Sequence, residues 1–309
     1  MFAVVGGRRL VAVLAGGVLA VSLSGQPGVA DSFVTTDGGF PPCVYNLSIL
    51  DGGSGAPRPA ATFSDPFTAP RAQDWCSQNT GTASILTTPT GMELSIPATL
   101  QSHLSDQKPP LVGDNAELLP FVSFDPGMTM ATRIKVPDGA QLKGTTGWGL
   151  SNRNFNPKRV ELAWFAWWGP NGPVSNALAP VLNVLNTTFF NTTDPIGFFI
   201  MVKRADEDQI RLQRLDPALL NEFHSYGIKL STDKVDFFID EESVGSFDNP
   251  PQGEGKFLNG QRSPLLFQTW IDAKPWPLPL VPEIDDRGFV NYMTGYHQGP
   301  IESTSLAYP

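Results

Sequence analysis

The sequence predicts an all-β protein, and three observations support this fold class. Proline (29 residues) and glycine (30 residues) are abundant and spread through the chain, which indicates many turns. No long segment shows the 3.6-residue period of an amphipathic helix. Short runs with strand-like alternation instead follow one another between turn-forming residues. At 309 residues the chain is long enough for one large β-sandwich domain.

The stretch from Phe223 to Phe247 shows this alternation most clearly. Alternate residues from His224 to Leu230 fall on one face of an extended strand, and alternate residues from Val235 to Ile239 do the same. The polar link 231–234 supplies a turn, and a second polar link, 240–243, reverses the chain again. The sequence therefore predicts a β-hairpin with one buried face, followed by a short return strand.

The N-terminal sixty residues precede the expected sandwich domain. Residues 1–30 contain paired arginines, an apolar run and a small-residue cleavage site, the three parts of a secretory signal peptide. The apolar run is too short for a transmembrane anchor. We therefore expect a secreted, extracellular protein that is cleaved near Ala30 and has no membrane insertion afterwards. Residues 31–60 are predicted to be a loop-rich lead-in, and residues 61–309 the β-sandwich domain.

Within this domain, further strands are expected between clusters of turn residues. Hairpins are predicted over Ser84–Ile96, with a turn at 89–91, and over Gly197–Leu215. Leu118–Phe124 and Met128–Val136 are expected to pair about the turn Asp125-Pro126-Gly127. The segment Gly169–Pro195 is a long interruption, of the kind that forms functional rims or flexible insertions.

Charge and cysteine content narrow the classes of partner. The net charge of −9 and the pI near 4.8 disfavour nucleic acid and anionic membrane surfaces, which attract basic proteins.

Cys43 and Cys76 are expected to form a disulfide in an exported protein, although Cys76 could also be buried as a small apolar residue. Neither cysteine has zinc-site spacing, and the acidic triplet 206–208 is interpreted as a solvated turn rather than a calcium site. No cofactor fingerprint is present.

Several motifs occur in a recognisable order. They are Met128–Pro137 with the turn 138–139, Trp148–Leu150, Val160–Trp168, the motif Phe-His-x-Tyr-x-Ile that begins at Phe223, and Pro264–Asp272. This order resembles the laminarinase-type β-glucanases (glycoside hydrolase family 16-type) of the concanavalin A-like lectin/glucanase superfamily. The resemblance covers roughly residues 120–275. It implies a concanavalin A-like jelly-roll β-sandwich of two antiparallel sheets, with a concave face that holds a glycan.

The resembling enzymes carry their catalytic residues on one strand, as Glu-x-Asp-x-Glu or a one-residue-longer variant. Retaining glycosidases of this kind need one carboxylate as nucleophile and another as general acid/base. Placing the pattern on Val160–Trp168 gives Glu161 at the first position, Ala163 at the second, and Phe165 or Ala166 at the third. The resemblance therefore implies a degenerate catalytic motif. Glu161 is either a hydrogen-bonding residue in a glycan groove, half of a relocated carboxylate pair, or a solvated charge at the entrance of the strand.

The same placement assigns the aromatic residues of this strand to faces. Phe165 and Trp167 share the face of Glu161, so they are expected to form a platform on which sugar rings stack, with Trp164 and Trp168 in the core. The alternative is that all four pack in a core. A shift of one residue would exchange the two faces.

A late strand is expected to contribute to the same sheet. Trp270 and Asp272 fall on one face of Pro264–Asp272, which lines the concave sheet in the resembling enzymes. Trp270 is therefore a candidate ligand-binding residue. Asp272 is either a displaced carboxylate that faces Glu161 or a residue that binds a turn amide.

These observations predict a secreted, glucanase-like β-sandwich protein that binds a polysaccharide or oligosaccharide and lacks the standard catalytic carboxylates. The alternative is an active glycoside hydrolase that cleaves O-glycosidic bonds with a rearranged pair, Glu161 and Asp272. A third interpretation is a surface or envelope protein in which Gly169–Pro195 fills the binding face, so that no ligand binds.

Overall fold

A computed structural model describes residues 40–41, 43, 62–68, 74–97, 115–137, 144–152, 158–169, 196–253, 264–272 and 289–300. The predicted signal peptide lies outside these residues, as does the interruption from residue 170 onwards to 195. Only three residues of the lead-in are described, among them Cys43. No helix within the described ranges is long and apolar enough to cross a membrane.

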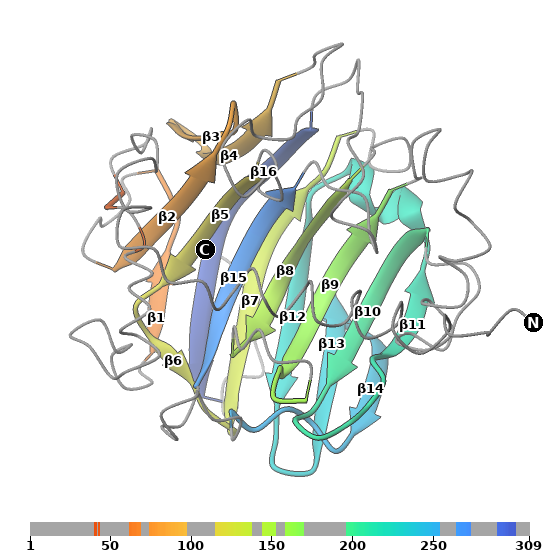
Figure 1. Ribbon diagram of the computed structural model, residues 1–309. Helices are drawn as coiled ribbons and strands as arrows, with labels where there is room; N and C mark the ends of the chain where they lie inside the picture. The colour runs from red at the N-terminus through yellow and green to blue at the C-terminus, as the bar shows by residue number, and fades with distance from the viewer. Residues whose placement is uncertain are drawn as a thin grey trace, which may run out of the picture.

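The described strands form two antiparallel sheets of eight strands each, which pack as two layers (Figure 1). Sheet I has the order β11 (Arg211–Leu215), β10 (Gly197–Lys203), β9 (Leu162–Trp168), β8 (Thr145–Ser151), β15 (Leu265–Asp272), β5 (Asn115–Pro120), β2 (Trp75–Thr80), with β6 (Ser123–Phe124) beside β15. Sheet II has the order β14 (Glu242–Asp248), β13 (Lys234–Ile239), β12 (His224–Leu230), β7 (Met128–Lys135), β16 (Phe289–Pro300), β4 (Gly91–Ile96), β3 (Ser84–Thr88), with β1 (Phe63–Asp65) beside β16. This architecture confirms the predicted jelly-roll sandwich.

An aromatic core fills the space between the two sheets. From sheet I, the Trp148 ring lies 4.7 Å from that of Tyr226 on sheet II, and the Phe165 ring lies 5.2 Å from that of Phe237. These four side chains are fully buried. Because burial of one large apolar side chain stabilises the fold by about 1.5–3 kcal/mol, this core is the main source of cohesion between the layers.

Three predicted hairpins are confirmed. In the first, β12 pairs with β13, and Tyr226, Ile228 and Leu230 point inward as their alternation predicted. In the second, β10 pairs with β11, and in the third, over Ser84–Ile96, β3 pairs with β4. The short 3₁₀ helix η4 (Pro217–Asn221) connects β11 to β12, and Asp216 caps its start.

One predicted strand pair is wrong. Residues 118–124 were expected to pair with 128–136, but β5 and β6 lie in sheet I whereas β7 lies in sheet II. The turn at 125–127 therefore crosses between the layers, and Gly127 N donates to Leu230 O over 2.8 Å at the crossing. The turn residues indicated a reversal correctly, but a local pattern does not say which neighbour each strand takes.

The disulfide predicted between Cys43 and Cys76 is present. Cys43 N donates to Ser77 O (2.7 Å), and Ser77 N donates to Pro41 O (3.0 Å), so the segment near Cys43 runs along the edge of β2. The bond closes a sequence separation of 33 residues. It therefore fixes part of the lead-in against sheet I.

The turn between β13 and β14 offers a test of backbone strain. Asp240 and Glu241 form a two-residue hairpin turn, with φ of 49° and 71°. Because positive φ at both positions favours glycine, Glu241→Gly is expected to raise the free energy of unfolding by about 0.5–1 kcal/mol in urea denaturation. Glu242→Gly is the control, since Glu242 lies in β14 without positive φ and glycine there should destabilise. A loss of stability in Glu241→Gly would contradict this prediction.

Candidate functional site

The two faces of β9 are the reverse of the predicted assignment. Phe165 and Trp167 point inward, and the Phe165 ring lies 5.0 Å from that of Tyr226 in the inter-sheet core. Trp164 and Trp168 belong instead to a separate apolar cluster on the outer face of sheet I. Phe165 and Trp167 therefore do not form the platform for sugar rings that the sequence predicted, because the two faces are exchanged by one residue along the strand. Side chains packed in the inter-sheet core cannot stack on a ligand.

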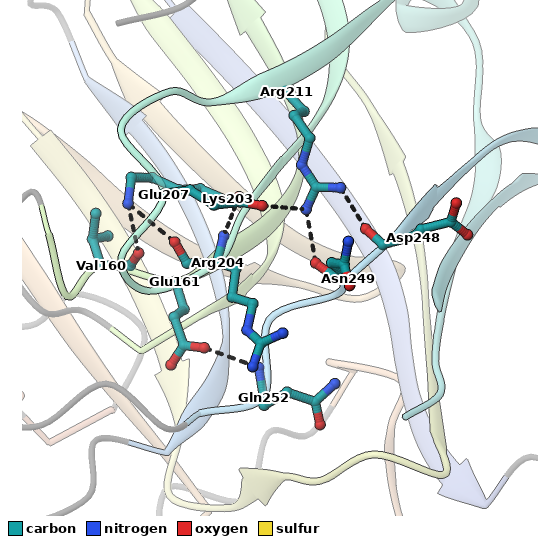
Figure 2. A network of polar contacts seen from close by, with 9 residues as sticks. All are labelled: Val160, Glu161, Lys203, Arg204, Glu207, Arg211, Asp248, Asn249 and Gln252. Carbon is teal, nitrogen blue, oxygen red and sulfur yellow. Dashed lines mark hydrogen bonds and ion pairs between the residues drawn. The ribbon is translucent and has the colours of Figure 1, made fainter. Parts of the chain in front are cut away.

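Glu161 is fully buried immediately before β9. One carboxylate oxygen, Oε1, accepts a hydrogen bond from Gln252 N (2.9 Å), which lies beyond β14 of sheet II. Glu161 N donates to Asn152 Oδ1 (2.9 Å), and Asn152 N donates back to Glu161 O (3.1 Å). Glu161 thus joins the start of β9 to a loop that follows the other sheet (Figure 2).

A polar network continues from Glu161 along the same end of the sandwich (Figure 2). Lys203, nearly buried at the end of β10, donates through Nζ to Val160 O (3.4 Å) and Arg204 O (3.2 Å). Burial lowers the pKa of Lys203, while the carboxylates of Glu207 and Glu161 oppose this shift. The charges of this network therefore offset one another within the fold.

Arg211 extends this network to the edge of sheet II. It pairs with Glu207 (3.4 Å) and donates to the main-chain oxygens of Asp248 and Asn249. Figure 2 shows Arg211 reaching across to the end of β14. These contacts occupy carbonyl groups at the end of an edge strand, where unpaired groups otherwise invite association. The network therefore connects the two sheets and has a structural role.

Asp272 and Glu161 are not brought together. Asp272 pairs with Thr145, and Thr145 pairs with Trp168, so Asp272 aligns with the last residue of β9. Glu161 precedes the first residue of that strand. At about 3.3 Å per residue, about 20 Å of strand separates the two positions. Because paired glycosidase carboxylates lie within about 10 Å of each other, the predicted pair does not have the geometry of an acid/base pair.

The outer face of sheet I carries an aromatic group that we call the outer aromatic cluster. It consists of Trp164 and Trp168 on β9, Phe199 on β10 and Trp270 on β15. The ring centroids of Trp164 and Trp270 lie 4.7 Å apart, and those of Trp168 and Phe199 lie 5.6 Å apart. Trp270 is only 8% exposed and Trp168 only 5%, whereas Trp164 retains more exposure. Trp164 is therefore the member best placed to contact a ligand.

Gly147 lets Trp270 lie directly against the sheet. A Cβ atom at Gly147 would be 2.4 Å from the Cη2 atom of Trp270 and 2.7 Å from the main-chain oxygen of Phe165. Any other residue at this position would push the indole away. The predicted ligand-binding residue Trp270 is thus positioned by a neighbouring strand.

Glu117 on β5 lies directly beside this cluster, because it is the cross-strand partner of Trp270. It is 5% exposed. Burial raises the pKa of Glu117 to about 8, against a hydrogen bond from Gln268 Nε2, and the charge of Asp272 raises it further. The structure therefore places Asp272 near a carboxyl group that is protonated at neutral pH.

Sequence reasoning missed Glu117 because the expected strand began at Leu118, whereas β5 begins at Asn115. The signal that could have found it is the period-2 alternation of the expected strand, continued from Leu118 towards the N-terminus. Ala116 and Leu118 point into the core, so Glu117 had to point to the opposite face. No cluster of three metal-ligating side chains occurs within the described part of the chain.

Three polar atoms near Glu117 and Trp270 are buried without a hydrogen-bond partner among the described residues. They are Gln78 Oε1 on β2, Gln268 Oε1 on β15 and Trp164 Nε1 on β9. Gln78 is the cross-strand partner of Glu117, and Gln268 donates its amide to it. Buried polar groups normally have hydrogen-bond partners. Buried polar atoms without such a partner, beside aromatic rings, are therefore a feature expected of ligand-binding sites.

Comparison with known proteins agrees with this architecture. The sequence matches no protein-family model and no curated protein. A solved prokaryotic β-1,3-1,4-glucanase (lichenase) from a mouse hindgut metagenome superposes with a TM-score of 0.50 at 12% identity, covering 78% of this chain and 100% of the lichenase. The fold is a glucanase-type, concanavalin A-like jelly roll. This confirms the fold that the order of the motifs implied.

Other jelly rolls are also similar to this chain. A putative β-glucanase from Mycobacterium abscessus has a TM-score of 0.46 at 14% identity, covering 77% of this chain and 99% of that protein. A pseudo β-1,3-glucanase of Mycobacterium tuberculosis, described as an immunostimulatory antigen, has a TM-score of 0.47 at 12% identity, covering 77% of this chain and 98% of that protein.

In this glucanase-type jelly roll, the outer face of β9 has no carboxylate. Its four outward positions are Leu162, Trp164, Ala166 and Trp168. A string of alternate carboxylates, as the resemblance implies for an active enzyme, would have to occupy these positions. Apolar and aromatic side chains stand there instead.

Proposed function

We propose that this protein binds a polysaccharide or oligosaccharide on the outer face of sheet I, without the carboxylate string that glucanases use for cleavage. The observation that carries the proposal is the outer face of β9, where Trp164 packs on Trp270 and no carboxylate is present. Aromatic faces are suited to the apolar faces of sugar rings, and the neighbouring polar atoms are suited to hydroxyl groups.

The shared fold supports a glycan as the ligand class. The lichenase with the same fold is a β-1,3-1,4-glucanase. Fold alone does not fix function, so the proposal depends on the residues of the outer face. The predicted signal peptide supports an extracellular location, where polysaccharides are accessible.

The proposal is tested by retention on insoluble polysaccharides. Trp164→Ala is expected to weaken binding of the mature protein by about tenfold or more, because a central aromatic contact typically contributes 1–2 kcal/mol or more to binding. Phe238→Ala is the matched control, since Phe238 is partly exposed on β13 of the other sheet. Equal retention of the wild type and Trp164→Ala would contradict the proposed binding face.

A second candidate function is hydrolysis by a different carboxyl pair. Glu117 has a pKa of about 8 and is influenced by the charge of Asp272. Asp272 is opposite Asn115, two residues from Glu117, so the two are diagonal neighbours with Cα atoms about 7–8 Å apart. A protonated carboxyl beside an ionised one is the arrangement of a general acid and base. This candidate predicts reducing-end release that both Glu117→Gln and Asp272→Asn abolish.

A further inference from the structure

A carboxyl group is enclosed by amides at the edge of the outer aromatic cluster. Glu117 lies between Gln78 on β2 and Trp270 on β15 in one row across sheet I. Gln268 is diagonal to it and donates a hydrogen bond to its Oε1 atom. Gln78, Gln268 and Asp272 retain partial exposure, whereas Glu117 itself is nearly buried. The partly exposed residues therefore surround a carboxyl group that solvent hardly reaches.

Burial favours a proton on Glu117, whereas the hydrogen bond from Gln268 Nε2 favours its ionised form. The oxygen atoms Gln78 Oε1 and Gln268 Oε1 have no partner among the described residues. An ionised Glu117 would add a negative charge next to carbonyl oxygens, which accept hydrogen bonds but cannot donate them. A protonated Glu117 supplies an O–H donor that these oxygens, or a ligand hydroxyl, can accept. Burial therefore favours the neutral acid, which carries a donor for these oxygens or for a ligand.

The charged surroundings agree with this arrangement. On the outer faces of the strands that flank Glu117, the titratable group within the described residues is Asp272 on β15, since Cys76 on β2 is in a disulfide. The Asp272 side chain raises the pKa of Glu117, so it opposes a second negative charge beside it. The described part of this site therefore presents amides, an indole, one neutral acid and one carboxylate.

We propose that Glu117 is a proton-bearing ligand-binding residue, and that the outer face takes uncharged polysaccharides in a manner coupled to that proton. This inference rests on the proposed carbohydrate-binding function. Neutral sugar hydroxyls both donate and accept hydrogen bonds, so they match the acid and the amide oxygens together. Acidic polysaccharides are disfavoured, because their carboxylates would meet Asp272 and acceptor oxygens. Ionisation of Glu117 removes the donor and adds a repulsive charge.

The test is a titration of the purified mature protein with soluble neutral glucans, lichenan and laminarin, and with polygalacturonate, from pH 6 to 9.5. The proposal requires that only the protein with Glu117 protonated binds. Because the pKa of Glu117 is about 8, the affinity for the neutral glucan should then fall about 30-fold between pH 7 and pH 9.5. Polygalacturonate is expected not to bind at any of these pH values. In Glu117→Gln, which keeps a donor and cannot ionise, binding should persist and the affinity should become independent of pH.

Glu93→Gln is the matched control, because Glu93 is a partly exposed glutamate on β4 of the other sheet and should keep the wild-type pH profile. The inference is overturned if the wild type binds neutral glucan with the same affinity at pH 7 and 9.5, or if Glu117→Gln keeps the wild-type pH dependence. Tighter binding of polygalacturonate than of either glucan would also overturn it. Absence of binding to all three polymers at every pH would overturn the proposed function as well, which separates the two failures.

Discussion

Replacing Glu161 with alanine is expected to lower the free energy of unfolding by about 1–3 kcal/mol. The carboxylate is fully buried and accepts a hydrogen bond from the main chain of Gln252. Its removal leaves that N–H group without this acceptor and removes an opposing charge from the surroundings of buried Lys203. Chemical denaturation of the wild type and the variant at neutral pH measures the difference.

Asp208→Ala is the matched control for Glu161→Ala. Asp208 is an exposed carboxylate in the turn of the same network region, and its removal is expected to change stability by less than about 0.5 kcal/mol. Glu161→Gln should fall between the two, because its amide oxygen still accepts the Gln252 hydrogen bond. If Glu161→Ala kept full stability but lost glycan binding or cleavage, Glu161 would be a functional residue rather than part of a structural polar network.

Replacing Glu117 with glutamine is expected to raise the free energy of unfolding at pH 7 by about 3 kcal/mol. The folded protein holds a proton on Glu117 up to a pKa of about 8, whereas the unfolded chain releases it near the ordinary value of 4.5. Between these values the unfolded state binds fewer protons, so stability falls as pH rises, by about 1.4 kcal/mol per pH unit. Across the whole window the wild type should lose roughly 5 kcal/mol that the variant does not lose.

Urea denaturation of both proteins between pH 4.5 and 8.5 measures this difference. The free energies of unfolding should be close at the acidic end and diverge steadily towards pH 8. Glu93→Gln should follow the wild-type curve throughout. Parallel curves for the wild type and Glu117→Gln would mean that Glu117 is ionised in the folded protein at neutral pH, and would remove the physical basis for proton-coupled binding.

Local alternation predicted the hairpin from His224 to Ile239 because one face of each strand is clearly more apolar than the other. The same reasoning misplaced Phe165 and Trp167. Almost every residue of β9 is buried on both faces, so no polar contrast indicates which side faces the core. A strand of this kind leaves its frame undetermined, and an error of one residue exchanges the faces.

Pairing between strands that are far apart in the sequence explains the other differences between the predictions and the structure. The sequence contained Glu117, Asp272 and Glu161, but only the register of β5, β15, β8 and β9 shows which of them are neighbours. Likewise, the turn at 125–127 was predicted as a reversal, and its crossing between sheets depends on partners far along the chain. The order of the motifs was sufficient for the fold, and it was not sufficient for the site.

We propose that this jelly roll binds glycan and does not cleave it. To test this proposal, the purified mature protein is incubated with a panel of β-glucans, galactans and arabinans. Both its retention on insoluble polymer and the release of reducing ends are measured. We expect the wild type to be retained, Trp164→Ala to be retained less, and no reducing ends to be released above a protein-free control. Release of reducing ends that is abolished in Glu117→Gln would contradict it, and would show that this face performs hydrolysis with a different carboxyl pair.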